Sequence, residues 1–425
     1  MSPPMIPGWL ERMAPRCWYA LSGDRPDLHL QATPPGTRYL RDNDPARDPR
    51  LNPPGSLRER VRHLLGRAPR PPWHGSVGFA AITEAWNSAV YASGLGASGA
   101  MVVFGGGHND YFGSDMHAFD LETREWRRVS DGFTAGSDRD YGEGAVYPDA
   151  VYPDGSPLPP HTYDYVQYDP VSNDYLLLKG QTELGRAVKA VPIPHLFNLT
   201  TLRWRRGPQH PTAILNSAGC TTWDASRRVL WGHSGDDAGG NAFVGFHPDG
   251  ANPDGTYGAW SSRHPNKFPG MANHNAMQIV PGGDVIVVSV HAANALFTLD
   301  PADPARPALP LAAEGEKPAL HPFASLQYLP GSDRLVYFSP LDAGTIHTIA
   351  PADASHPNAG RSTWRWTAHR PVQEASSLAI TAHDAHSPGS RAHAFGRFRV
   401  ATFDGIEIAI LVRSYDAPVL AWRFD

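Results

Sequence analysis

The chain of 425 residues has only two cysteines, Cys17 and Cys220. This small number excludes a disulfide framework and a cysteine-rich zinc site. Basic residues are not in surplus either, since 37 Lys and Arg stand against 42 Asp and Glu. Proteins that bind nucleic acid or an anionic membrane through charge usually carry a basic excess. We therefore expect neither a nucleic-acid nor a membrane partner.

Long hydrophobic runs are also missing. No apolar stretch approaches the length of about 18 residues that crosses a bilayer as a helix. The first residues, MSPPMIPGWLERM, lack the basic and then apolar segments of a secretory signal peptide. Taken alone, this start indicates a cytoplasmic protein, whereas a chain whose leader has been removed would look the same. The compartment therefore stays open.

The sequence does contain a repeated pattern of short apolar segments separated by glycine-rich turns. Because no run shows convincing helical periodicity, we expect an all-β fold. One unit recurs with a period of about 50 residues. It begins with a strand that carries glutamine and ends near proline, as in VQYDP (166–170), MQIVP (277–281) and LQYLP (326–330). Two apolar strands follow, and a fourth strand carries a tryptophan.

Six such units can be followed along the chain. The second strands are expected at 101–106, 175–180, 229–232, 285–290, 335–340 and 406–412. The third strands are expected at 116–121, 195–199, 242–246, 295–300, 346–350 and 419–424. The fourth strands carry Trp126, Trp204, Trp260 and Trp364, and an apolar stretch at 308–313 takes this place in the fourth unit. Four strands in a unit of this length indicate a β-propeller.

The sixth unit has no fourth strand of its own before the chain stops. The segment 17–22 has the pattern of a fourth strand, and we expect it to complete the last blade. Closing the ring in this way removes the exposed edge that an open sheet would present. Six blades are therefore expected, although a seventh could lie within 368–394. The prediction is one propeller domain over 1–425, with a Pro- and Arg-rich linker or insertion at 23–80 and the blades at 81–425.

The segment MVVFGGGHNDYFGSDMHAFDLETREW (101–126) resembles a kelch blade, with a glycine run after the second strand and a tryptophan after the third. With GRFRV (396–400), it makes most of the chain similar to the bacterial kelch/galactose-oxidase-like propeller proteins. This resemblance implies a kelch-type propeller, which by itself sets no chemistry. Copper oxidation as in galactose oxidase is not expected, because the sequence has no Tyr-His dipeptide. Propeller-fold polysaccharide lyases, such as ulvan lyases, resemble the chain in fold and residue types. They use His and Tyr as base and acid, with Arg or His neutralising a uronate.

Histidines from five units fall at one position of the repeat. In a propeller, the loop after each second strand and the loop before each first strand open on the same face, near the axis. These loops carry His108, His161, His233, His274, His291 and His321, and the sixth unit contributes Arg397. Residues so far apart in the sequence would not share this position by random scatter. We therefore expect a histidine-rich site at one mouth of the propeller.

Histidine can act as a base or an acid near neutral pH. Removing a proton beside a carboxylate needs a base, an acid for the leaving oxygen and a donor or cation for the developing charge. We expect His161 or His108 as the base, Tyr163 as the acid and Arg397 as the neutralising cation. The expected substrate-binding residues are Trp86, Asn87, Asp110, Tyr111, Tyr141, His274 and His321. The first hypothesis is therefore a carbohydrate-active enzyme, a lyase that cleaves a uronate polysaccharide by β-elimination.

Two other hypotheses stay open. Neutral imidazoles suit Zn, Cu or Ni, and His233 and His291 are the candidate ligands of a divalent metal, Zn or Ca, in a metal-dependent hydrolase. Alternatively, the propeller is not an enzyme and binds a glycan or a protein through the same mouth. His108 could also serve only a blade turn, and Arg397 could only pair with a carboxylate. The expected partner is a polysaccharide or oligosaccharide, and the expected state is a monomer.

Overall fold

The structure is a computed structural model in which most of the expected strands are described. The described residues are 4–21, 82–83, 86–106, 113–130, 146–182, 190–211, 215, 219–234, 243–261, 275–280, 285–303, 305–339, 342, 344–352, 363–372, 396–413 and 418–424. The expected linker or insertion at 23–80 lies outside them. Among the described residues, no helix has the length and apolar character needed to cross a membrane.

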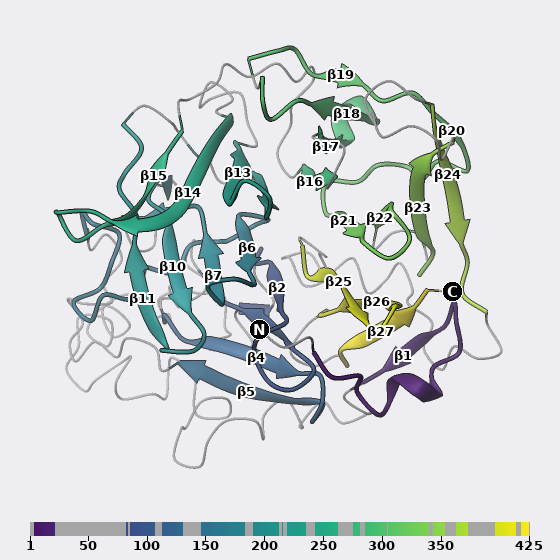
Figure 1. The fold of residues 1–425 in the computed structure, drawn as a ribbon, viewed down its shortest axis with the longest axis horizontal. Coiled ribbons are helices and arrows are strands. Elements are labelled where there is room, and N and C mark those ends of the chain that lie inside the picture. The colour runs from purple at the N-terminus through teal and green to yellow at the C-terminus, as the bar shows by residue number, and fades with distance from the viewer. Residues whose placement is uncertain are drawn as a thin grey trace, which may run out of the picture.

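Six sheets, each with four antiparallel strands, surround a common axis and form a six-bladed β-propeller (Figure 1). Blade one contains β2 (Ala89–Ala92), β3 (Ala100–Val103), β4 (Met116–Asp120) and β5 (Glu125–Ser130). Blade two contains β6 (Val166–Asp169), β7 (Asp174–Leu177), β10 (His195–Asn198) and β11 (Arg203–Arg206). Blade three contains β12 (Cys220–Asp224), β13 (Val229–His233), β14 (Phe243–Ala251) and β15 (Tyr257–Trp260). Blade four contains β16 (Ala276–Val280), β17 (Val285–Val290), β18 (Ala295–Leu299) and β19 (Leu309–Pro310). Blade five contains β21 (Ser325–Leu329), β22 (Arg334–Phe338), β23 (Ile346–Pro351) and β24 (Trp364–His369), with β20 (Ala313–Gly315) added at its edge. Blade six contains β25 (Phe398–Phe403), β26 (Ile406–Leu411), β27 (Leu420–Arg423) and β1 (Trp18–Ala20).

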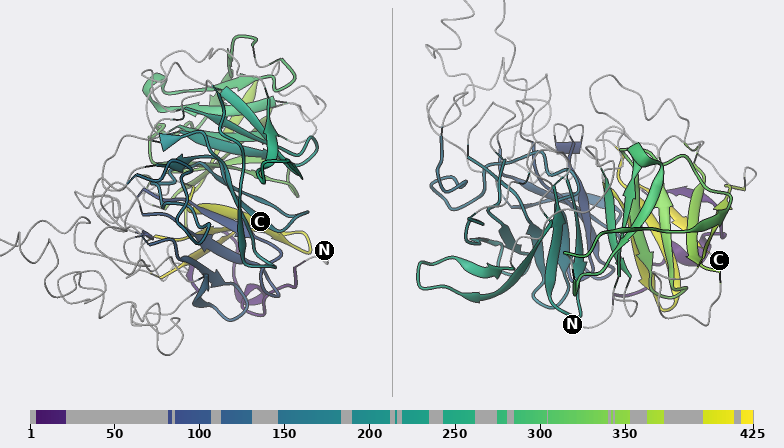
Figure 2. Two further views of the ribbon diagram at one scale, coloured as in Figure 1. Left: turned by 90° about the vertical axis from the view of Figure 1, so that its left-hand side faces the viewer. Right: turned by 90° about the horizontal axis from the view of Figure 1, so that it is seen from above.

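The first strand of each blade lies next to the axis, and these six inner strands form a closed ring. Each inner strand contacts the next one around the ring, in the order β2, β6, β12, β16, β21 and β25. The last of these, β25, contacts β2 and so completes the ring. β1 pairs antiparallel with β27, with Trp18 opposite Trp422. Six blades and a closing N-terminal strand, both predicted from the repeat, are therefore confirmed. Figure 2 shows the blades from the side, with their strands running between two faces of the ring. The kelch type within this fold stays a prediction.

The tryptophans of the repeat have a simple packing role. In blades one to three, the fourth-strand tryptophan lies directly opposite a phenylalanine of the third strand. The pairs are Phe119 with Trp126, Phe197 with Trp204, and Phe246 with Trp260. Their ring centroids are 5.4, 4.9 and 5.2 Å apart. Cross-strand aromatic pairs of this kind stabilise the outer half of a sheet, which explains why the pattern recurs in the sequence.

The stretch 308–313 departs from the expected single strand. Only Leu309–Pro310 pairs with β18 as the fourth strand of blade four. The following residues, Ala313–Gly315, instead run parallel to β24 and add a fifth strand to blade five. This connection therefore joins the outer edges of two neighbouring blades.

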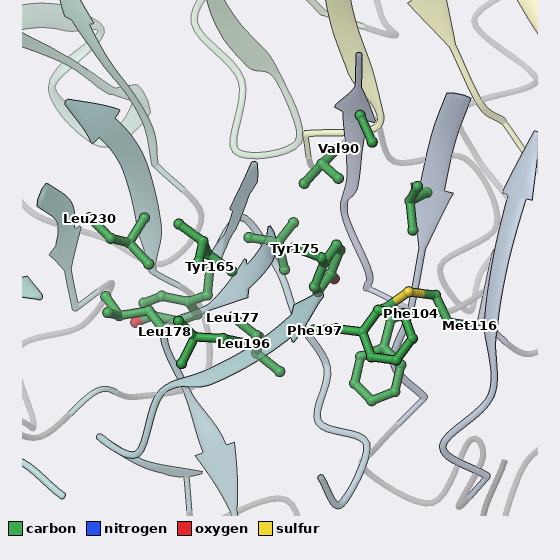
Figure 3. Packing of buried hydrophobic residues seen from close by; sticks show 14 of the residues in the cluster. Val90, Phe104, Met116, Tyr165, Tyr175, Leu177, Leu178, Leu196, Phe197 and Leu230 are labelled. Carbon is green, nitrogen blue, oxygen red and sulfur yellow. The ribbon is translucent and has the colours of Figure 1, made fainter. Parts of the chain in front are cut away.

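The core lies between blades, where the apolar second strands pack against their neighbours. Figure 3 shows this packing, with Val90, Phe104 and Met116 of blade one facing residues of blade two. The blade-two side chains in that cluster include Tyr165, Tyr175, Leu177, Leu178, Leu196 and Phe197. Because both faces of these strands are covered, their sequences read as continuous apolar runs.

Candidate functional site

The inner strands begin at one face of the ring, and the second strands end there. In blade three, for example, Cys220 at the start of β12 lies opposite His233 at the end of β13. We call this face the histidine face. The predicted site residues that the structure describes are Trp86, Asn87, His161, Tyr163, His233, His321 and Arg397. Those outside the described residues are His108, Asp110, Tyr111, Tyr141, His274 and the side chain of His291.

His161 and Tyr163, the predicted base and acid, lie together with Trp86. The centroid of the His161 ring is 5.7 Å from that of Tyr163 and 5.0 Å from that of Trp86. His161 has no exposed surface and Tyr163 is 6% exposed, whereas Trp86 is half-buried. The structure therefore brings three predicted site residues together, and Trp86 is the one that reaches the surface.

Hydrogen bonds between two loops hold this group in place. Asn87 Nδ2 donates to the carbonyl of Ile82 at 2.9 Å, and Asn87 Oδ1 accepts the backbone N–H of Thr162 at 2.8 Å. Thr162 Oγ1 in turn accepts the N–H of Ser88 at 2.9 Å. The N–H of Tyr163 donates to the carbonyl of Trp86 at 2.8 Å. Asn87, expected to bind substrate, thus also ties the loop before β2 to the loop that carries His161.

The backbone of Tyr163 is in the left-handed region, with φ at 43°. A non-glycine residue in this region costs free energy and persists only where its surroundings hold it. Here the Ser88 hydroxyl donates to the Tyr163 carbonyl, while the Tyr163 N–H is bonded to Trp86. The fold therefore fixes the direction of the Tyr163 side chain at some cost, as is common at functional sites.

Lys179 lies beside Tyr163, and it was not among the residues predicted from the sequence. Its Nζ is 4.7 Å from the centroid of the Tyr163 ring and 5.3 Å from that of Tyr165. The side chain is only 2% exposed, and burial lowers the pKa of the Lys179 amine to about 7. The amine therefore gains or loses its proton near neutral pH. We call His161, Tyr163 and Lys179 the His–Tyr–Lys cluster.

A buried ion pair lies next to this cluster. Arg399 Nη2 donates to Asp164 Oδ1 at 2.9 Å, and its Nε donates to the carbonyl of Ala89 at 2.7 Å. Arg399 therefore links blade six to blades one and two. Burial raises the pKa of Asp164 to about 6, against the opposing effect of the Arg399 charge. The Asp164 carboxyl is thus a second group that titrates not far from neutrality.

Arg397, the predicted neutralising cation, is completely buried. Its Nη1 donates to the carbonyl of Thr83, in the segment that precedes blade one. The guanidinium thus joins the sixth blade to the start of the first. Its role toward a substrate stays a prediction.

His233 and His321 lie in different settings. His233 ends β13, is fully buried, and has its ring 6.4 Å from that of Phe243. His321 is half-buried, packs on Phe323 at 4.9 Å, and its Nδ1 accepts the N–H of Phe323 at 3.2 Å. Within the described part of the chain, no three His, Cys, Asp or Glu side chains are placed to hold one metal ion. The metal site expected at His233 and His291 therefore remains a prediction.

His195 is a further buried histidine at this face that the sequence did not single out. It begins β10, is 1% exposed, and burial lowers the pKa of its imidazole to about 3. Gly180, next to Lys179, packs so closely that an added Cβ would lie 2.9 Å from His195 Nε2. His195 is therefore neutral at physiological pH and packs against Gly180, the residue that follows Lys179.

No protein-family model matches the chain, and no curated protein matches it. Among solved structures, it is similar to the crystal structure of Mala s 1, the major allergen of Malassezia sympodialis. The TM-score is 0.45 at 9% sequence identity, with 81% of this chain and 95% of that chain covered. A similarity at this level carries no argument about activity. The propeller fold is established by the strand pairing described above.

Proposed function

We propose that this protein is a carbohydrate-active enzyme, a polysaccharide lyase that cleaves a uronate-containing glycan at the His–Tyr–Lys cluster. The observation that supports the proposal is the close arrangement of an imidazole, a phenol and an amine with a pKa near 7. Acid–base catalysis works best with groups that titrate near the working pH. Perturbed amines in buried polar clusters are also a common feature of active sites.

In the proposed reaction, His161 removes the proton from the carbon that bears the uronate carboxylate. The electron pair of that C–H bond forms a new carbon–carbon double bond, and the bond from the adjacent carbon to the glycosidic oxygen breaks. The Tyr163 hydroxyl gives its proton to this leaving oxygen. The products are an unsaturated uronate and a free sugar hydroxyl. His161 holds the extra proton and Tyr163 lacks one, until exchange with solvent restores both.

Lys179 supplies positive charge for the carboxylate, whose charge increases as the proton leaves. A carboxylate beside the amine favours its protonated form, so substrate binding raises the pKa of Lys179. In the free enzyme, kcat/KM should decline above pH about 7, because the amine loses its charge there. Replacing Lys179 by Arg should shift this decline to higher pH, since guanidinium stays protonated. An unchanged pH profile in the Arg variant would remove Lys179 from this role.

The direct test uses a panel of uronate polysaccharides and follows the ultraviolet absorbance of the double bond that elimination creates. Wild-type protein should produce a rise with at least one polymer. His161→Ala and Tyr163→Phe should each reduce the rate by a factor of about 100 or more. His247→Ala is the matched control, because His247 is exposed on β14 and should leave the rate unchanged. Full activity in both cluster variants would refute the assignment.

One observation favours the alternative of a propeller that binds a glycan or protein without catalysis. His161 and Arg397 have no exposed surface, as expected for residues that only support a binding mouth. In that case no polymer would give a rise in absorbance. Single substitutions would then weaken binding in graded steps, without one position that abolishes it. A flat trace over the whole panel, together with retained glycan binding, would favour this alternative.

A further inference from the structure

The opposite end of the central axis carries a cavity of about 440 Å³. Its lining comes from the inner strands, from near the middle, as at Gln278 of β16, to the far end, as at Tyr328 of β21. Because each inner strand begins at the histidine face, this cavity extends along the axis toward the other face of the ring. The volume falls within the range of about 300–1,000 Å³ typical of small-ligand sites. None of His161, Tyr163 and Lys179 is among its described lining residues, although Arg399, the partner of Asp164, is.

Three glutamines from three blades supply hydrogen-bond acceptors to this cavity. Gln167, Gln278 and Gln327 all line it, and they hold equivalent places in their inner strands. Their Nε2 atoms donate to the carbonyls of Thr221, Ile279 and Leu326, at 2.8, 3.0 and 2.7 Å respectively. These bonds set the orientation of each amide. Among the described residues, none donates to the three Oε1 atoms, which stay available to a ligand.

Aromatic rings form a further part of the wall. The hydroxyl of Tyr168 donates to Asn173 Oδ1 at 2.8 Å, and that of Tyr328 donates to Asp333 Oδ1 at 2.7 Å. Since these hydroxyls serve the blade turns, the tyrosines contribute mainly their rings. Trp223 also lines the cavity, and the Arg228 guanidinium lies 5.6 Å from its ring centroid. The Nε1 of Trp223 is itself buried, so this residue contributes its ring to the wall.

The charges around the cavity restrict the ligand further. Among the described lining residues Arg399 is the charged one, and its charge is balanced by Asp164 from outside the cavity. None of the described lining residues is acidic, so a cationic ligand would find no counter-charge. The Oε1 atoms of the three glutamines can accept hydrogen bonds from sugar hydroxyl groups. The aromatic rings can pack against the C–H face of a pyranose. We propose that this cavity binds a neutral sugar unit, through residues that are not part of the proposed lyase site.

The test titrates the full chain with methyl glucoside, methyl galactoside, methyl mannoside and N-acetylglucosamine, monitored by calorimetry and tryptophan fluorescence. At least one sugar should bind with a Kd in the millimolar range or tighter. Gln278→Leu should weaken this binding at least tenfold. Gln278 suits the test because its amide bonds only to the neighbouring Ile279 carbonyl, whereas Gln167 also bridges two blades. Leu309→Ala, on the exposed outer strand of the same blade, is the matched control.

His161→Ala separates this proposal from the lyase proposal. Neutral-sugar binding should persist in that variant even where elimination is lost, because His161 lies at the other face. Binding that disappears with His161→Ala but survives Gln278→Leu would overturn the cavity assignment. Failure of all four sugars to bind the wild-type protein would overturn it as well. If Gln278→Leu proves unstable, Tyr328→Ala tests the same cavity from another blade.

Discussion

At the residue scale, Lys179 connects the stability of the protein to the proposed chemistry. An exposed lysine has a pKa of about 10.4, whereas burial lowers the pKa of Lys179 to about 7. Between these two values the unfolded chain binds more protons at this site than the folded chain. The contribution of Lys179 to stability therefore increases as pH rises from about 7 to about 10. At pH 7 and below, burying the amine opposes folding.

We expect Lys179→Met to abolish elimination and to stabilise the protein by about 1–3 kcal/mol at pH 7. The gain should shrink as pH rises toward 10, because the amine must lose its proton on folding and this loss costs less free energy as pH approaches the pKa of the unfolded chain. Urea unfolding of both proteins at pH 7, 8 and 9 measures this difference. A gap that stays constant with pH would show that the folded protein does not lower the pKa of Lys179.

Of the His–Tyr–Lys cluster, His161 and Tyr163 were predicted from the sequence, whereas Lys179 was not. His161 and Tyr163 could be found because they hold the same repeat position as residues of other blades. Lys179 follows the apolar run YLLL, and a charged residue at the end of a strand normally indicates a return to solvent. Tyr163 and Tyr165 cover it from the segment just before β6. The pairing of β6 with β7 brings these tyrosines to the end of β7, a contact that the order of the residues does not show.

At the scale of elements, the strands were predictable because both faces of each blade are covered. The burial of β3, with all four residues inside, leaves an apolar run that is visible in the sequence. β20 could not be foreseen in the same way. Its three residues are all exposed, and only the available edge of β24 determines their pairing. Edge strands of this kind depend on their neighbour rather than on their own pattern.

The turn into β25 requires glycine at position 396, because a side chain there would have no room. Its φ is 72°, and an added Cβ would overlap the Asp164 carboxylate and lie 2.8 Å from Ser88 Oγ. We expect Gly396→Ala to destabilise the protein by about 3 kcal/mol, from backbone strain and from displacement of the buried ion pair. Gly405→Ala is the matched control, since Gly405 has a φ of 81° but open space around it. The control should lose only about 1–2 kcal/mol, as measured by urea unfolding. Equal losses would mean that the contact with Asp164 is unimportant.

At the scale of the whole molecule, Trp18 holds the ring closed. Its ring lies 5.4 Å from that of Trp422 in blade six and 5.7 Å from that of Phe338 in blade five. Its indole N–H donates to the carbonyl of Gly344 at 2.8 Å, again in blade five. The closing strand therefore fastens two blades at once.

We expect Trp18→Ala to destabilise the protein by about 3–5 kcal/mol, through the cavity it leaves and the lost hydrogen bond. Thermal unfolding measures the loss. Trp18→Phe should recover part of it, because a ring would still pack against Trp422. If the alanine variant melts like the wild type, closure does not depend on this side chain.

The pairing of Trp18 with Trp422 also has a consequence for synthesis on the ribosome. The closing strand leaves the ribosome first, and its partner is made about 400 residues later, which is a wait of about 20–80 s at ordinary elongation rates. During this interval no blade can hold the strand in its final place. A nascent chain halted before blade six should therefore remain sensitive to protease near Trp18. Protection of that segment would begin only after β27 has emerged.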